Sequence, residues 1–225
     1  MTAPRPAASG SLDARPRPAP PGPPLPAGIS RLELGPGAEV HVAVPIELPD
    51  AVPLLVFCHG AGGSGANALA TVGEAAAARG VVVLAPSSVA TTWDLVAGGL
   101  GRDVAVIDAA LEHVFDRLPV GRVALGGFSD GGSYAVSLGI ANGELFGDVL
   151  AFSPGFLAPP AQRGQPRVWV AHGTEDRVLP VDRCGRRVVQ QLRQAGYDVT
   201  YEEFTGGHVV PPELVGAGLD WWLAG

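Results

Sequence analysis

The sequence has few charged residues and few cysteines, and each shortage excludes a class of protein. Charged residues make up 16% of the 225 residues, the formal net charge is −7, and no basic run extends beyond the pair Arg186-Arg187. A surface that binds nucleic acid or an anionic membrane needs clustered basic residues, so we expect neither partner. The two cysteines, Cys58 and Cys184, match no metal-ligand spacing, so we expect no metal site.

The sequence also lacks a long hydrophobic run. No segment approaches the roughly 20 consecutive apolar residues of a membrane-spanning helix. The N-terminal segment lacks the continuous apolar core of a secretory signal. These two absences predict a cytoplasmic protein without a membrane span.

Large apolar side chains are almost absent from the first 28 residues, which are dominated by proline, alanine and glycine. Such a composition cannot bury enough apolar surface to offset the entropy of ordering the chain. We therefore predict a disordered, proline-rich tail over residues 1–28 and one folded domain over residues 29–225. Hydrophobic residues make up 47% of the whole chain, which is enough for a substantial core.

Short apolar runs alternate with segments of helical periodicity from residue 54 to the end. Several runs are continuously apolar, as expected for strands buried on both faces. The predicted strands are residues 40–44, 54–57, 81–84, 122–125, 149–152, 167–171 and 199–204, and the predicted helices are residues 67–79, 103–118, 133–140, 183–195 and 213–223. The alternation predicts an α/β domain with a mostly parallel sheet, helices on both faces and an antiparallel edge before residue 54.

A serine between glycines follows the fourth predicted strand, in the sequence Gly127-Phe128-Ser129-Asp130-Gly131. A serine on a sharp turn from strand to helix needs neighbours without side chains, because the strand and the helix would otherwise clash. The pattern predicts that Ser129 is a nucleophile. An ordinary glycine-rich turn capped by a serine is the alternative.

A nucleophilic serine needs a histidine within hydrogen-bond distance and a carboxylate that orients the imidazole. In a sheet of this kind both partners follow the serine in the chain, the acid before the base. Asp176 follows the sixth predicted strand, and His208 is the one histidine after it. We therefore predict a triad of Ser129, Asp176 and His208, with Glu175 and Asp182 as competing candidates for the acid.

The charged oxygen of a tetrahedral intermediate needs two backbone N–H donors. One comes from the residue after the nucleophile and the other from a loop after an earlier strand. The glycine-rich sequence CHGAGGSG supplies such a loop, so we predict the amides of Ala61 and Asp130 as the oxyanion hole and expect His59 to brace the turn. A phosphate-binding loop is the rival interpretation, but no lysine follows at the required spacing.

Two aromatic residues, Trp93 and Phe156, come soon after strand ends. Reactive groups of such a sheet gather at the carboxyl ends of its strands. We therefore predict that Trp93 and Phe156 wall an acyl pocket, and ordinary packing is the alternative for each.

Four motifs at predicted strand ends together resemble the α/β-hydrolase fold. In chain order they are the early H-G loop, G-F-S-D-G-G, H-G-T-E-D and G-G-H. The resemblance covers nearly everything after residue 30. It is strongest to the branch of phospholipase/carboxylesterase-like and polyhydroxybutyrate-depolymerase-like serine esterases, which lack a large lid. Asp130 stands where that branch often has glutamine, which leaves the acyl preference open.

The resemblance implies a serine hydrolase that needs no cofactor and cleaves small carboxylic esters or thioesters through an acyl-enzyme. Two alternatives remain. One is an acyltransferase or cyclising thioesterase with the same triad. The other is a catalytically inactive binding module, because a fold does not fix a function.

Overall fold

The computed structural model describes residues 9–35, 37–96 and 98–225. In this part of the chain, eight strands form one sheet in the order β1-β2-β4-β3-β5-β6-β7-β8. The strands are β1 (Gly28–Leu32), β2 (Val40–Val44), β3 (Val52–Cys58), β4 (Val82–Pro86), β5 (Val120–Phe128), β6 (Asp148–Phe152), β7 (Arg167–Gly173) and β8 (Val199–Phe204). The helices are α1 (Gly65–Ala77), α2 (Arg102–Phe115), α3 (Asp130–Ala141), α4 (Gly185–Gln194) and α5 (Pro212–Leu223).

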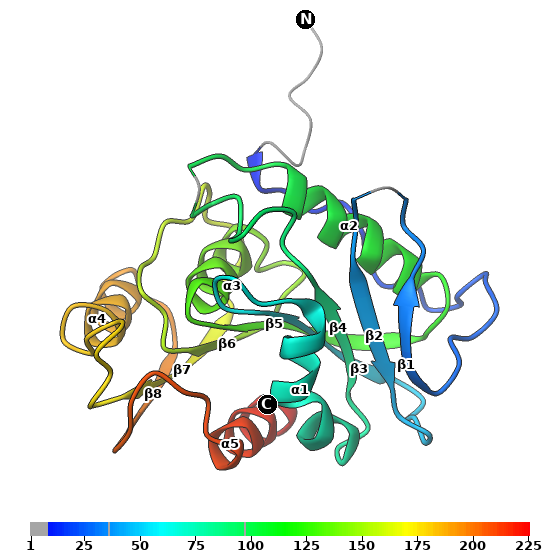
Figure 1. Cartoon of the computed structure of the whole chain (residues 1–225). Coiled ribbons are helices and arrows are strands. Elements are labelled where there is room, and N and C mark those ends of the chain that lie inside the picture. The colour runs from blue at the N-terminus through cyan, green and yellow to red at the C-terminus, as the bar shows by residue number, and fades with distance from the viewer. Residues whose placement is uncertain (1–8, 36, 97) are drawn as a thin grey trace, which may run out of the picture.

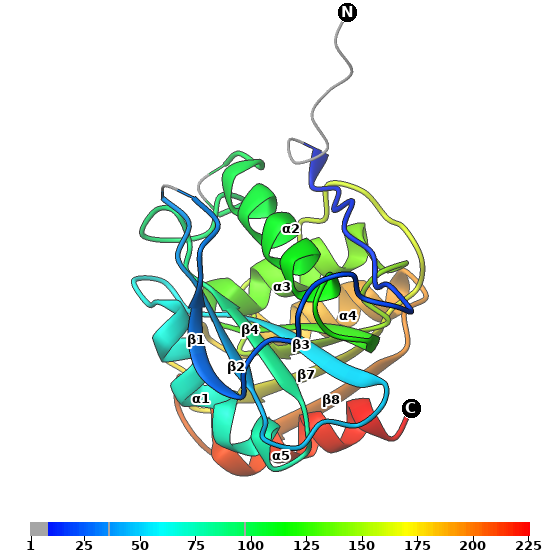
Figure 2. The ribbon, with the colours of Figure 1, turned by 90° about the vertical axis from the view of Figure 1, so that its right-hand side faces the viewer.

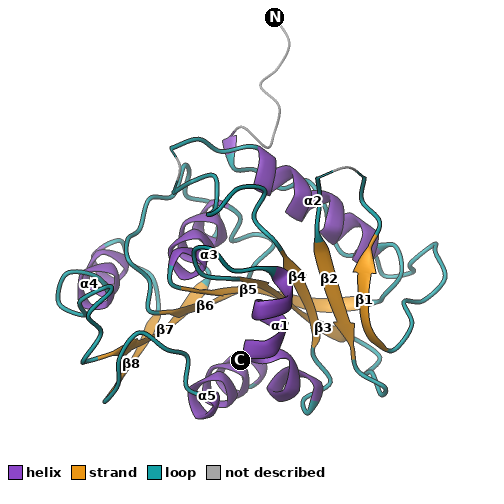
Figure 3. Cartoon of the chain, viewed as in Figure 1, coloured by secondary structure: helices purple, strands orange, loops and turns teal. Residues whose placement is uncertain are grey.

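Helices cover both faces of the sheet (Figures 1 and 3). Helices α2, α3 and α4 pack on one face through residues such as Ile107, Tyr134 and Val188. Helices α1 and α5 pack on the other through residues such as Leu69 and Trp222. Strands β3 to β8 pair in parallel, whereas β1 and β2 pair antiparallel at one edge. The predicted α/β architecture and the predicted antiparallel edge are therefore confirmed. β1 is an additional strand at this edge, since the first strand predicted from the sequence was residues 40–44.

The continuous apolar runs become the centre of the sheet because both faces are covered. All residues of β3, β4 and β6 are buried. The parallel strands share one direction, so their carboxyl ends meet at one edge of the sheet. This edge carries the residues that the sequence singled out.

The N-terminal segment differs from the predicted disordered tail. Residues 9–27 run along the surface beside α2 (Figure 2), and residues 1–8 lie outside the described residues. The Leu12 side chain is 1% exposed and belongs to the core. The amide of Leu12 donates to Asn142 Oδ1 at 2.9 Å, and the amides of Asp13 and Ala14 donate to Asp108 Oδ1.

The prediction for residues 9–27 was wrong because it weighed only the apolar content of the segment. Polar side chains of the folded domain accept its backbone N–H groups, and these hydrogen bonds add to the burial of Leu12. Asn142 also donates to Gly10 O at 2.8 Å, and Arg17 forms an ion pair with Asp116 at 2.9 Å.

Candidate active site

Ser129 lies on the turn between β5 and α3 in a backbone conformation that is rare for a residue with a side chain. Its φ is 59° and its ψ is −119°. The surrounding structure holds this conformation: the Ser129 amide donates to Phe152 O at 2.9 Å, and Ser129 O accepts from the Ser133 amide at 2.9 Å. Strain of this kind persists only where neighbouring contacts enforce it, and it gathers at functional sites.

The glycines around Ser129 are required by close backbone contacts. A Cβ atom on Gly127 would overlap the carbonyl of Gly131, and one on Gly131 would overlap the carbonyls of Cys58 and His59. The close approach of strand and helix that the sequence predicted is therefore confirmed.

Ser129, His208 and Asp176 form one hydrogen-bonded chain across the carboxyl edge of the sheet. His208 Nε2 lies 2.9 Å from Ser129 Oγ, and His208 Nδ1 lies 2.6 Å from Asp176 Oδ2. Since the carboxylate is the acceptor, Nδ1 carries the proton and Nε2 is left to accept from the serine hydroxyl. The serine is 8% exposed and the aspartate 5% exposed, so these two residues are largely shielded from water.

The carboxylate of Asp176 is oriented by backbone donors as well as by the histidine. Its Oδ1 accepts from the amides of Val178 at 2.9 Å and Leu179 at 2.8 Å. Burial alone would raise the pKa of Asp176, but the hydrogen bonds from His208, Leu179 and Val178 outweigh it and lower the pKa below its usual value. The ionised form is therefore the favoured one.

The two competing acids lie elsewhere. Asp182 forms an exposed ion pair with Arg186. Glu175 is exposed, and its side chain makes no hydrogen bond or ion pair with His208 within the described residues. Of the three acids that the sequence offered, the structure places Asp176 alone against the histidine.

A second histidine, His172, also lies against Asp176. The sequence pattern did not single out His172 for this role. Its side chain is fully buried, and Nε2 lies 2.8 Å from Leu179 O and 3.3 Å from Asp176 Oδ2. Since a carbonyl can only accept, Nε2 carries the proton. Burial lowers the pKa of His172, which favours the neutral ring. The histidine at the end of β7 was visible in the sequence, but only the fold shows what it contacts.

The loop after β3 lies against the nucleophile. A Cβ atom on Gly60 would come within 3.4 Å of Ser129 Cβ. The amides of Ala61 and Asp130 donate no hydrogen bond within the described residues. Two free N–H groups at this edge match the donors that an oxyanion hole requires.

His59 braces this loop, as expected. Its Nδ1 lies 2.6 Å from Gly60 O, and Nε2 accepts from the Ser88 amide at 2.9 Å. A carbonyl accepts and an amide donates, so the ring is neutral with its proton on Nδ1. Burial lowers the pKa of His59, in keeping with that state.

Trp93 does not wall an open pocket, contrary to the prediction. It is 0% exposed, stacks on Tyr134 with ring centroids 4.8 Å apart, and donates from Nε1 to His59 O at 2.8 Å. The loop after β4 folds inward, because the indole has both an apolar neighbour and a hydrogen-bond acceptor beneath the glycine-rich loop. Trp93 therefore supports the backbone of the glycine-rich loop through its hydrogen bond to His59 O.

An open cavity of about 820 Å³ lies beside the histidine. It is lined by Thr174, Glu175, Asp176, Arg177, Val178, Gly207 and His208. The sequence pattern did not single out Thr174, Arg177 or Val178, because surface loops carry no periodic signal.

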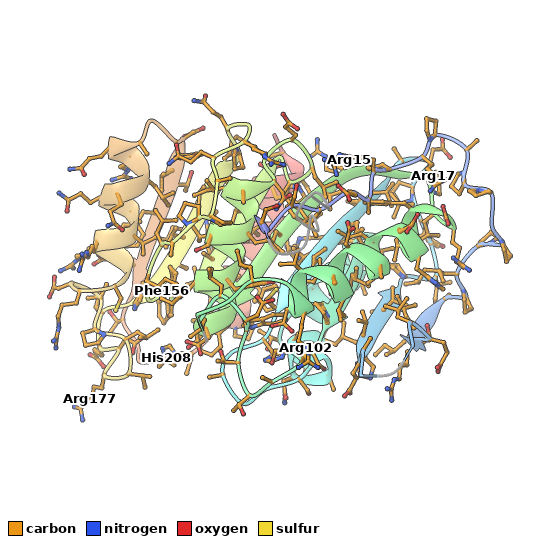
Figure 4. The ribbon with its side chains drawn as sticks, turned by 90° about the horizontal axis from the view of Figure 1, so that it is seen from above. Arg15, Arg17, Arg102, Phe156, Arg177 and His208 are labelled. Carbon is orange, nitrogen blue, oxygen red and sulfur yellow. The ribbon has the colours of Figure 1, made fainter. Side chains whose placement is uncertain are left out.

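Phe156, the other predicted wall, is half-buried and is not among the residues that line this cavity. Figure 4 shows Phe156 and His208 on the same side of the molecule, with Arg177 extending away from its body. The role of Phe156 stays a prediction.

Within the described residues, no helix is both long enough and apolar enough to cross a bilayer.

Both cysteines are free and buried. Burial raises the pKa of the Cys58 thiol well above its usual value, so Cys58 is an unreactive core residue.

Comparison with known proteins agrees with this geometry. An acyl-protein thioesterase 1 of Gibberella zeae is 32% identical over 102 residues. That match covers 41% of this chain and 43% of the relative, so the chain spans less than half the length of the relative that it matches.

Solved structures share the fold at low sequence identity. A fluorophosphonate-binding serine hydrolase of Staphylococcus aureus superposes with a TM-score of 0.69 at 13% identity, over 89% of this chain and 98% of that one. The acyl-protein thioesterase 2 of Zea mays superposes with a TM-score of 0.57 at 18% identity, over 82% and 97% of the two chains. Both are evidence for the fold alone.

The family model described as Phospholipase/Carboxylesterase matches residues 103–217, which is more than half of the chain and includes the serine turn, the aspartate and the histidine. The protein therefore belongs to the phospholipase/carboxylesterase family of α/β hydrolases.

Proposed function

We propose that this protein is a serine hydrolase that cleaves carboxylic esters or thioesters of small molecules through an acyl-enzyme. The observation that carries the proposal is the hydrogen-bonded chain from Ser129 through His208 to Asp176, at 2.9 and 2.6 Å. A serine hydroxyl is a weak nucleophile, and a neutral imidazole held in the correct tautomer is what activates it.

In the first half of the proposed reaction, Ser129 Oγ attacks the acyl carbon and its proton moves to His208 Nε2. Asp176 keeps the proton on Nδ1 and stabilises the imidazolium that forms. The amides of Ala61 and Asp130 donate to the charged oxygen of the tetrahedral intermediate. When that intermediate collapses, the bond to the leaving alcohol or thiol breaks, and His208 Nε2 returns the proton to it.

In the second half, water takes the place of the leaving group. His208 accepts a proton from the water as its oxygen attacks the acyl carbon of the ester on Ser129. The second tetrahedral intermediate then releases the carboxylic acid, and the proton on Nε2 returns to the serine oxygen. His208 lines the open cavity, so water from the cavity reaches the histidine ring.

The substrate class and the location are part of the proposal. The family supports an ester or thioester, and the open cavity supports a small molecule. A cytoplasmic location agrees with the two free cysteines.

A panel of substrates tests the proposal. The purified protein is offered p-nitrophenyl acetate and butyrate, a butyryl thioester and the matching butyryl amide, and the products are followed with and without an added alcohol. We expect turnover of the esters and the thioester to the free acid, with the amide far slower. Folded protein that cleaves none of them contradicts the proposal, and an acyl product formed mainly on the alcohol would indicate an acyltransferase.

A further inference from the structure

The residue after the nucleophile carries a carboxylate, and that carboxylate has a defined partner. Thr92 Oγ1 donates a hydrogen bond of 2.7 Å to Asp130 Oδ2. Thr92 belongs to the β4–α2 loop, described over residues 87–96 and 98–101, whereas Asp130 is the first residue of α3. The side-chain pair therefore ties this loop to the turn that presents one of the two proposed oxyanion-hole amides.

The same loop also holds the segment that presents the other amide. Thr91 O accepts from the Gly62 amide at 2.8 Å, and Trp93 Nε1 donates to His59 O at 2.8 Å. Ala61, the proposed donor, lies between the two bonded residues His59 and Gly62. Thr91 and Trp93, which form these two hydrogen bonds, are the immediate neighbours of Thr92 in the chain.

The β4–α2 loop is itself anchored at the start of α2. The two carboxylate oxygens of Asp103 accept from the amides of Val89 and Asp94, each at 2.7 Å. Asp94 Oδ2 in turn accepts from the amides of Gly101 at 2.8 Å and Asp103 at 3.0 Å. The buried carboxylate of Asp103 and the half-buried one of Asp94, each with two backbone donors, make a rigid support, because each bond would have to break before the loop moved.

An unrestrained carboxylate at position 130 would oppose catalysis. The oxyanion develops negative charge beside the amide of this same residue, and two negative charges at short range repel. A hydroxyl that donates to Asp130 Oδ2 fixes where the carboxylate lies and disperses part of its charge. A single contact can therefore orient the turn and restrain the charge.

We propose that the side chains of Thr92 and Asp130 form a positioning pair that sets the distance between the two oxyanion-hole donors, an inference that rests on the proposed function. Neither side chain needs to touch the substrate. The pair acts through the amides of Asp130 and Ala61, so its loss lowers the rate of the chemical step more than it weakens substrate binding.

Thr92→Val is the first test, because valine keeps the shape of threonine and removes the donor. Loss of a whole donor costs roughly 10²–10³ in kcat, so we expect a misplaced donor to lower kcat about tenfold with KM little changed. Thr92→Ser, which restores the hydroxyl, should recover most of the lost kcat. Equal kcat for Thr92→Val and the wild type overturns the proposal.

The second test asks whether the two side chains act as one unit. Asp130→Ala removes the acceptor, and we expect it to lower kcat as much as Thr92→Val does, with the double variant no slower than either single one. Asp130→Asn keeps an acceptor oxygen for Thr92 Oγ1, so it should lose less kcat than Asp130→Ala. Losses that multiply in the double variant contradict a shared role, and if Asp130→Ala folds poorly, the comparison of Thr92→Val with Thr92→Ser still tests the pair.

A matched control separates positioning from a general loss of a hydrogen bond. Thr71 Oγ1 donates to Asn67 O at 2.9 Å on α1, so Thr71→Val loses a similar bond away from the site, and we expect kcat to be unchanged. The inhibition constant of a trifluoromethyl ketone, whose adduct with the serine carries an oxyanion, should rise in parallel with the loss of kcat in Thr92→Val. A wild type without esterase activity refutes the proposed function, whereas an active wild type with an unaltered Thr92→Val refutes the pair alone.

Discussion

The two sides of the candidate site are built differently. The oxyanion side, residues 59–63, 87–96 and 127–132, is held by buried aromatic rings and by hydrogen bonds between segments far apart in the chain. The histidine side, residues 174–182 and 205–211, borders an open cavity of about 820 Å³. Val178 and Val209 on this side are 66% and 52% exposed.

The difference follows from what each side would have to do. Donors that stabilise a developing charge are effective when they are fixed before the reaction, so rigidity is useful on the oxyanion side. The leaving group and the attacking water both exchange with solvent next to His208, so access is useful on the histidine side. The predictions below break one side or the other, from the largest expected effect to the smallest.

Ser129→Ala should have the largest effect, because it removes Oγ, the proposed nucleophile on which the oxyanion side and the histidine side both act. We expect kcat on p-nitrophenyl butyrate to fall by roughly 10⁶, because only substrate binding and the oxyanion hole then remain to accelerate the reaction. Far-UV circular dichroism should be unchanged, because Ser129 lies on a turn. Residual turnover well above that level assigns the nucleophile to another residue.

Asp176→Asn breaks the histidine side. An asparagine cannot hold the imidazole in the productive tautomer, so we expect kcat to fall by about 10⁴. Asp182→Asn is the matched control, because its carboxylate pairs with Arg186 on the surface and should cost little. The opposite ranking of the two variants would move the acid to Asp182.

Trp93→Phe tests the support beneath the oxyanion side. Phenylalanine keeps a stacked ring but cannot donate to His59 O, so we expect kcat to fall about tenfold, and stability to fall by about 1 kcal/mol. Trp222→Phe on α5 is the control, because Trp222 is equally buried and its Nε1 has no partner among the described residues. Equal losses of kcat in the two variants would show that packing, and not the bond to His59, matters.

The pH dependence of stability tests the buried histidines, one on each side. Burial lowers the pKa of both His59 and His172 in the folded chain. As the pH falls below about 6.5, the unfolded chain takes up protons that the folded chain does not, so the free energy of unfolding should decrease.

Chemical denaturation at pH 7.5 and at pH 5.5 measures this change. His172→Gln should show a smaller decrease than the wild type, because one buried histidine is gone while His59 and the half-buried His113, whose pKa burial also lowers, remain. A free energy of unfolding that is the same at both pH values contradicts the account of neutral buried rings.

Acyl chain length should have the smallest effect. The segment between β6 and β7 contains no helix among its described residues, and the cavity beside His208 is open, so a long acyl chain stays largely in water. Each added methylene should then gain far less than the roughly 0.8 kcal/mol of full burial. We expect kcat/KM on p-nitrophenyl esters to be highest for short or medium chains, and a strong preference for palmitoyl over butyryl esters would contradict this.

The sequence predicted those features that depend on local patterns. The apolar runs located the strands, and β8 (Val199–Phe204) has the bounds that its residues suggested. The glycines around Ser129 predicted a close approach of strand and helix, because no other residue fits such a turn. The order of serine, acid and base then left His208 as the single histidine after Asp176.

The features that the sequence did not predict depend on contacts between distant residues. Trp93 follows a strand as a pocket residue would, yet it folds inward because His59 O and the Tyr134 ring lie there. Leu12 is buried through a bond to Asn142, 130 positions away. Composition and periodicity describe one segment at a time, so neither contact leaves a local signal.

The reaction of Ser129 with a fluorophosphonate tests the central claim most directly. Such a reagent phosphonylates an activated serine and spares an ordinary hydroxyl, so it reads out the relay without any assumption about the substrate. We predict one covalent adduct per chain by intact mass, located on Ser129 by peptide mapping, absent from Ser129→Ala and formed far more slowly by Asp176→Asn. An unmodified wild-type chain, or an adduct on another residue, would contradict the assignment of this site.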